Sequence, residues 1–86
     1  MSATEKPFDI VVFGASGYTG RLVAEYLAEE YGNTELRWAM AGRSLSKLAS
    51  VRSELGISDQ VALLEVDVES PESVSDMVDA CRVVIT

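Results

Sequence analysis

Three glycines at positions 14, 17 and 20 constrain the fold of this chain more than any other feature. They follow residues 8–13, an apolar run rich in β-branched and aromatic side chains that is typical of a strand buried on both faces. After them, from about Thr19 to the stop signal Gly32-Asn33, apolar residues recur at helical spacing. The sequence therefore predicts a strand, a glycine-rich turn and a helix whose buried face is formed by Leu22, Val23, Tyr26 and Leu27.

The remaining strands are predicted from short apolar runs. Residues 36–41 form a run that ends at Gly42, residues 61–66 form another that ends at Asp67, and residues 82–86 begin a fourth. Two helices are expected between them, one capped by Ser44 and one opened by Ser70-Pro71-Glu72. The first should bury Leu45, Leu48, Arg52 and Leu55, and the second Val74, Met77, Val78 and Cys81, with Cys81 packed as a small apolar residue.

This alternation predicts an α/β fold with the order β-α-β-α-β-α-β. Short connections and right-handed crossovers give a parallel, doubly wound sheet with strand order 3-2-1-4, which is about half of a six-stranded Rossmann fold. No linker, repeat or charge block interrupts the pattern. We therefore interpret residues 1–86 as the N-terminal part of a nucleotide-binding Rossmann domain, without a catalytic or substrate domain.

Composition restricts the partners. Seven Lys and Arg residues against 14 Asp and Glu give a net charge of -7, which repels nucleic acids and anionic membranes. No apolar run is long enough to span a bilayer and the N-terminus does not resemble a signal peptide, so a cytoplasmic location is expected. With no His and a single Cys, the chain offers no predicted catalytic residue and no predicted metal site.

The glycine-rich turn has the context of a site for the pyrophosphate of a dinucleotide. The first glycine lets the chain reverse, the second lets the backbone approach a phosphate, and the third lets the helix pack on the sheet. Amides at the helix start then face the anion, with added hydroxyl donors and a tyrosine that closes over the phosphates. The predicted residues are Gly14, Ser16, Gly17, Tyr18, Thr19 and Gly20.

Two alternatives stay open at this turn. The three glycines could form only a tight connection between a strand and a helix. Arg21, in the first helical turn, could contact a phosphate or remain a solvated surface residue.

The segment after the second strand indicates which dinucleotide is bound. The Asp or Glu that holds the ribose of NAD at this place is missing, and Arg43, Ser44 and Lys47 stand there instead. Arg43 can fork onto a 2′-phosphate and the other two add donors, which predicts NADP(H) rather than NAD. The alternative makes Arg43 a solvated loop charge and Ser44 only a helix cap.

The end of the third strand is expected to meet the adenine. There Asp67 would offer its side chain and Val68 its backbone amide. The alternative treats Asp67 as a turn residue.

With these segments in view, the chain resembles the N-terminus of the saccharopine dehydrogenase-like oxidoreductases. The resemblance rests on residues 8–20 and on Ala41-Gly42-Arg43-Ser44-x-x-Lys47-Leu48, and it covers nearly the whole chain. The family includes saccharopine reductases and trans-acting enoyl reductases. It implies a nicotinamide cofactor on this first domain and a substrate pocket on a second. The turn alone is also similar to that of N-acetyl-glutamyl-phosphate reductases, and the segment from Ala41 separates the two groups.

These predictions lead to competing functions. The first is the NADP(H)-binding segment of an oxidoreductase, inactive by itself because hydride transfer needs a substrate held against the nicotinamide. The alternatives are a non-catalytic NADP(H)-binding sensor or a domain for another adenosine-containing ligand. Exposed sheet edges also favour homo-oligomers.

Overall fold

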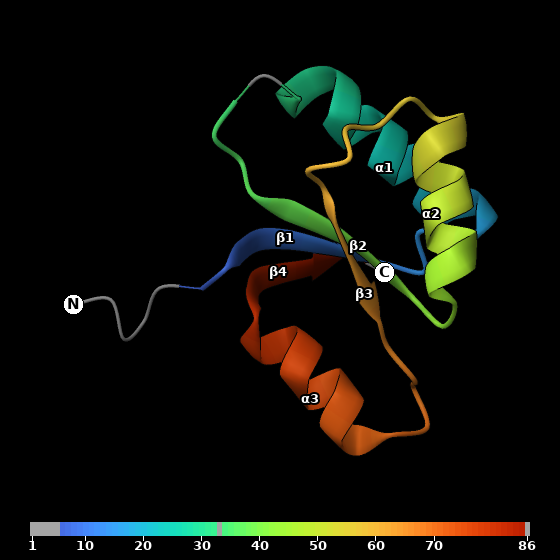
Figure 1. Cartoon of the computed structure of the whole chain (residues 1–86). Helices are drawn as coiled ribbons and strands as arrows, with labels where there is room; N and C mark the ends of the chain where they lie inside the picture. Colours follow the sequence, from blue (N-terminus) through green and yellow to red (C-terminus); the bar gives the residue numbers. More distant parts are fainter. Residues whose placement is uncertain (1–5, 33, 86) are drawn as a thin grey trace.

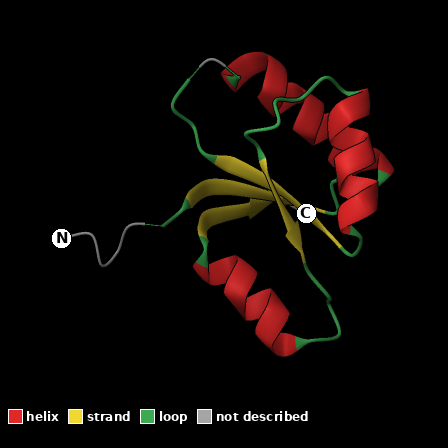
Figure 2. Cartoon of the chain, in the orientation of Figure 1, coloured by secondary structure: helices red, strands yellow, loops and turns green. Residues whose placement is uncertain are grey.

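The computed structural model of the chain describes residues 6–32 and 34–85. Its sheet has the strand order β3-β2-β1-β4 and all its pairs are parallel. Helices α1 and α2 cover one face of this sheet and α3 covers the other (Figures 1 and 2). The predicted doubly wound order 3-2-1-4 is confirmed. In chain order the elements are β1 (Phe8–Phe13), α1 (Tyr18–Tyr31), β2 (Trp38–Gly42), α2 (Leu45–Glu54), β3 (Ala62–Glu65), α3 (Pro71–Asp79) and β4 (Cys81–Ile85).

The core has two halves, one on each face of the sheet. Neighbouring residues of β1 divide between them, because successive side chains of a strand point to opposite faces. Val12 packs with the residues under α1 and α2, and Val11 packs with those under α3. Every residue of β2 is buried. The two central strands are therefore covered on both sides, as their continuous apolar runs predicted.

Helix α1 presents a different face to the sheet from the predicted one. Ala24 and Leu27 are buried, whereas Leu22 and Tyr26 are 51% and 57% exposed, so the prediction for these last two side chains was wrong. The reason lies in Gly20, which is one and two helical turns before Ala24 and Leu27 on the same face. Small residues on that face let the helix approach the sheet, and this approach turns the bulkier side chains outward.

The other boundaries shift by one or two residues. β2 begins at Trp38 and includes Gly42, and β3 covers only Ala62–Glu65. Two side chains predicted to be buried, Leu45 and Val78, are 44% and 49% exposed. Asn33 of the predicted stop signal and Thr86 of the last strand lie outside the described residues.

Cys81 opens β4 instead of closing the face of α3. Helix α3 ends at Asp79, and Ala80 is its C-cap. The backbone N–H of Ala80 donates to the carbonyl oxygens of Asp76 and Met77. The Cys81 thiol is buried and donates to the carbonyl of Met77 at 3.4 Å. Burial raises the pKa of this thiol, which suits the predicted role of a small packed residue.

One carboxylate ties three strands together at the amino-terminal edge of the sheet. Asp9 of β1 accepts a hydrogen bond from the backbone N–H of Arg37, just before β2, at 3.0 Å. Its other oxygen lies 3.6 Å from the guanidinium groups of Arg37 and of Arg82 in β4. The backbone bond from Arg37, together with the two cations, lowers the pKa of Asp9 against the opposing effect of desolvation.

We expect Asp9→Asn to destabilise the fold at neutral pH and to have little effect in acid. Because folding lowers the pKa of Asp9, the ionised carboxylate stabilises the folded chain. That contribution is complete above the unfolded pKa of about 3.9 and is lost as pH falls through the lower folded value. Urea unfolding of wild type and variant from pH 7 to pH 3 measures the difference. Asp59→Asn, at an exposed position, is the control, and a difference that does not change with pH would contradict the role of Asp9.

Gly20→Ala should destabilise the chain by about 1–3 kcal/mol, because an added methyl group overpacks the contact between helix and strand. A Cβ at Gly20 would lie 2.1 Å from the carbonyl oxygen of Gly14, which is backbone and cannot move aside cheaply. Urea unfolding checks this. Thr19→Ala, at the exposed neighbouring position, should stay within about 0.5 kcal/mol of wild type.

Candidate functional site: a glycine-rich turn and two strand ends

The turn after β1 is a sharp bend that is anchored to β2. Gly14 has φ +79°, a conformation that side chains rarely adopt. The amides of Gly14 and Ala15 both donate to the carbonyl oxygen of Ala41, at 2.8 and 3.1 Å. The Gly17 amide donates back to the carbonyl oxygen of Gly14 at 2.9 Å. These bonds fix the direction in which the next amides point.

Several amides at this bend have no partner within the protein. The N-cap residue of α1 is Gly17, which has no side chain to accept a hydrogen bond. The N-caps of α2 and α3 are Ser44 and Ser70, whose hydroxyls each accept a hydrogen bond from a backbone amide. Within residues 6–32 and 34–85, no hydrogen bond uses the backbone N–H of Ser16, Tyr18, Thr19 or Gly20. Unpaired amides at a helix start, at the positive end of the helix dipole, form a ready site for an anion.

The glycine at the middle of the turn keeps this site open. A Cβ at Gly17 would lie 3.3 Å from the carbonyl oxygen of Gly14, a contact tight enough to need a small adjustment. Its backbone is extended, with φ -84° and ψ 171°, so the conformation itself does not require glycine. What glycine provides here is the absence of a side chain beside the unpaired amides.

The side chains around the turn divide into two groups. Ser16 is half-buried, while Tyr18 is 82% exposed and Thr19 is exposed. These three therefore border the unpaired amides without filling the bend. Arg21, by contrast, forms an ion pair with Glu54 at the end of α2, at 3.0 Å, with both side chains exposed to solvent. Its guanidinium is engaged with α2 and not with the turn.

The start of α2 lies beside the turn. The Ser44 hydroxyl accepts the amide of Lys47 at 3.3 Å and lies 3.1 Å from the Ser46 hydroxyl. Ser44 is thus the predicted cap, and its neighbours Arg43 and Lys47 are exposed. A hollow of about 410 Å³ is lined by Ser16 from the turn together with Ser46, Lys47 and Ser50 from α2. The fold brings the first two predicted segments together.

The segment after β3 forms the third part of the candidate site. Asp67 is a turn residue, since its carboxylate accepts the amide of Glu69 at 2.9 Å and its own amide donates to the Ser73 hydroxyl at 3.0 Å. Val68 is 55% exposed, and none of the hydrogen bonds among the described residues uses its backbone N–H. A hollow of about 470 Å³ joins Asp67 to Arg43 and is also lined by Glu65, Glu69, Ser70 and Ser73.

The sequence reasoning missed part of that lining. Glu65 pairs with Gly42 in the sheet and therefore ends β3 next to Arg43. The signal available in the sequence was a charged side chain near the end of the predicted strand 61–66. Ser73 could have been found from its position three residues after the helix cap Ser70, but its bond to the Asp67 amide depends on how α3 folds back.

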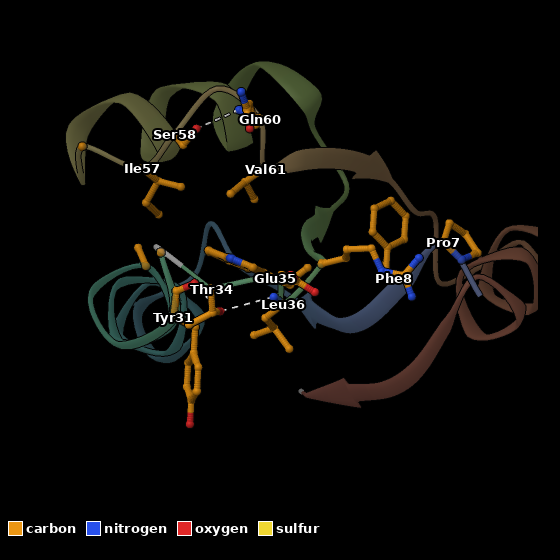
Figure 3. Close-up of a pocket in the computed structure, with 15 residues that line it drawn as sticks. Pro7, Phe8, Tyr31, Thr34, Glu35, Leu36, Ile57, Ser58, Gln60 and Val61 are labelled. Atoms are coloured by element: carbon orange, nitrogen blue, oxygen red, sulfur yellow. Dashed lines mark hydrogen bonds between the residues drawn. The ribbon is translucent and has the colours of Figure 1, made fainter. Parts of the chain in front are cut away.

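A further hollow lies at the opposite edge of the sheet. Its volume is about 520 Å³, and it is bordered by the end of α1, the start of β2 and the segment before β3. Figure 3 shows Ile57 and Val61 on one side of it and Thr34 and Glu35 on the other. None of the predicted nucleotide-binding residues lines it. The predicted site and this hollow are therefore separate.

The described residues show neither a metal-binding cluster nor a membrane-spanning helix. The part of the chain with assigned positions holds no group of three or more acidic, Cys or His side chains that could bind a metal ion. None of the helices described above has the length and apolar character required to cross a bilayer.

Comparison with known proteins gives a consistent group of relatives, although no family model matches the chain. A provisionally named trans-acting enoyl reductase of Mycobacterium tuberculosis is 41% identical over the whole chain. The saccharopine dehydrogenase-like oxidoreductase of Bos taurus is 38% identical over 99% of it, and the trans-acting enoyl reductase of Mycobacterium ulcerans is 34% identical over all of it.

This chain spans only about a fifth of the length of these relatives, 20% to 22%. The part that matches is their N-terminal segment. Along its whole length, the chain is thus related to the N-terminal segment of the saccharopine dehydrogenase-like oxidoreductases and trans-acting enoyl reductases, which confirms the resemblance predicted from residues 8–20 and 41–48.

Proposed function

We propose that this chain is the cofactor-binding N-terminal segment of an NADP(H)-dependent oxidoreductase. The observation that carries the proposal is the set of unpaired amides at Ser16, Tyr18, Thr19 and Gly20, at an uncapped helix start after a buried strand. The relatives carry the names of oxidoreductases, which independently supports a role in an oxidoreductase. The rest of the enzyme, including its substrate pocket, would come from sequence beyond this segment.

The pyrophosphate would bind at the glycine-rich turn. Amides of residues 16 and 18–20 would donate to its oxygens, and the positive end of α1 would favour its charge. The hydroxyls of Ser16 and Thr19 would add donors, and Tyr18 is exposed enough to move over the phosphates. Gly14 and Gly20 would act indirectly, by holding the bend and the helix in place.

The adenosine half would lie along the carboxyl ends of β2 and β3. Arg43, with Lys47 and Ser44 nearby, would hold a 2′-phosphate, because a guanidinium binds phosphate oxygens in pairs. The adenine would enter the hollow between Arg43 and Asp67. The amide of Val68, the next residue along the chain, would be its backbone donor. No carboxylate ends β2, so the ribose hydroxyls of NAD would lack their usual acceptor there.

The bound nicotinamide would supply hydride transfer. This chain has no His and no predicted proton donor, so its own residues would bind and orient the cofactor without completing the reaction. Its edge strands β3 and β4 leave backbone groups available for pairing, which supports self-association of the isolated segment. A cytoplasmic location also remains part of the proposal.

Titration of the chain with NADPH, NADH and ATP, followed by Trp38 fluorescence and amide chemical shifts, tests the proposal. We expect NADPH to bind most tightly and to shift the amides of residues 16–20. Gly17→Val should weaken binding about tenfold or more, since its side chain would occupy the space of the phosphate. Circular dichroism checks that the variant folds, because a Cβ here needs a small adjustment at the Gly14 carbonyl. Ser58→Val, remote from the turn, should bind like wild type. Failure of NADPH to shift residues 16–20 would refute the site.

Arg43→Ala should weaken NADPH binding about tenfold or more and leave NADH nearly unchanged. A charge-assisted hydrogen bond contributes about 1.5–3 kcal/mol, and NADH lacks the phosphate that would receive it. Arg52→Ala provides a control, because that arginine donates to the carbonyl oxygens of Asp59 and Val61 away from the turn. Equal losses for the two nucleotides would remove the 2′-phosphate role from Arg43.

A further inference from the structure

Helix α1 is apolar on two opposite faces. Ala24 and Leu27 face the sheet and are buried. On the opposite face, Tyr18, Leu22 and Tyr26 are 82%, 51% and 57% exposed. These three follow one another at intervals of four residues, so they lie along one line on the helix surface. A helix with apolar residues on two opposite faces is typically buried on both. In the described part of the chain, only the face of α1 toward the sheet is buried.

The exposed line continues into a hollow between α1 and the end of α2, which lie side by side (Figure 1). This hollow measures about 500 Å³ and is lined by Tyr18, Leu22 and Leu55 together with Ser16, Arg21 and Glu25. The surface thus groups exposed apolar side chains with polar ones, and such a group marks an interaction site more often than a single exposed apolar side chain does. Its shape, a ridge beside a groove, suits another helix.

The charges on this face restrict what can cover it. Glu25 and Glu29 lie three residues after Leu22 and Tyr26, which places them on the same exposed side of α1. Arg21 is already paired with Glu54, so the unbalanced charge of the face is negative. A second copy of this face, or an anionic lipid surface, would bring like charges together. A basic partner would instead place positive charges opposite Glu25 and Glu29.

We propose that the outer face of α1, formed by Tyr18, Leu22, Glu25, Tyr26 and Glu29, docks an amphipathic basic helix of a partner protein. The apolar residues of that helix would pack on Tyr18, Leu22 and Tyr26, and its Lys or Arg residues would meet Glu25 and Glu29. This is the helix-in-groove mode of recognition, with anchors at i, i+3 or i+4 and i+7. Tyr18 is shared with the proposed nucleotide site, whereas Leu22, Glu25, Tyr26 and Glu29 lie outside it. Variants of these four residues therefore test docking separately from nucleotide binding.

A synthetic helical peptide of about 15 residues, with leucines on one face and lysines on the others, is the probe. Titrated into the full chain, it should shift amides along residues 18–29. The double variant Leu22→Gln/Tyr26→Gln should weaken binding about tenfold or more, as expected for central anchors. Glu25→Gln/Glu29→Gln should weaken it less and reduce its dependence on salt. Val83→Gln, at a β4 side chain that is 52% exposed, is the matched control and should bind like wild type.

Other outcomes would overturn the proposal. They are the absence of binding, equal binding of a scrambled peptide of the same composition, shifts that fall outside α1 and α2, or an equal loss in Val83→Gln. Sedimentation that shows the chain dimerising through α1, with the dimer lost in Leu22→Gln/Tyr26→Gln, would identify a second copy as the occupant. Circular dichroism establishes that each variant is folded. If the apolar pair unfolds, the charged pair, half-buried Glu25 and exposed Glu29, provides the test.

Discussion

The close approach of α1 to the end of β1 is the contact on which the rest of this structure depends. It requires a helix residue without a side chain, Gly20, against the carbonyl oxygen of Gly14. Because α1 follows the carboxyl end of β1, its first amides lie at that edge of the sheet, beside the start of α2. The same approach decides which side of α1 is buried, and so which apolar side chains remain outside.

The opposite edges of the sheet are held in different ways. At the amino-terminal edge, the Asp9 carboxylate accepts a backbone amide and lies close to two arginines, so polar groups of three strands are paired within the protein. At the carboxyl edge, the amides at the turn have no partner among the described residues, and Arg43 lines a hollow together with the carboxylates of Glu65, Asp67 and Glu69. This contrast matches the general rule that open α/β sheets bind ligands outside the carboxyl ends of their strands.

Sequence reasoning predicted the architecture because each strand is a short apolar run and each helix has a recognisable start. Ser44 and Ser70 cap the helices as predicted, and the three glycines mark the bend. The faces of the helices were harder. Four apolar side chains that recur at helical spacing were predicted to be buried and are exposed: Leu22, Tyr26, Leu45 and Val78. Spacing alone cannot show how far small residues such as Ala24 let a helix rotate toward the sheet. The Asp9 cluster was also out of reach, since it joins residues 28 and 73 positions apart.

The unpaired amides have a consequence for the stability of the chain itself. A chain of 86 residues taken by itself buries only about 60% of the surface that its unfolded form exposes, so its folded state has little reserve. An anion that binds those amides only in the folded state adds about 2.7 kcal/mol when its concentration is a hundred times its dissociation constant. The concentration of such a ligand would then set how long the segment survives proteases, and ligand depletion would lower its abundance before it affected any reaction.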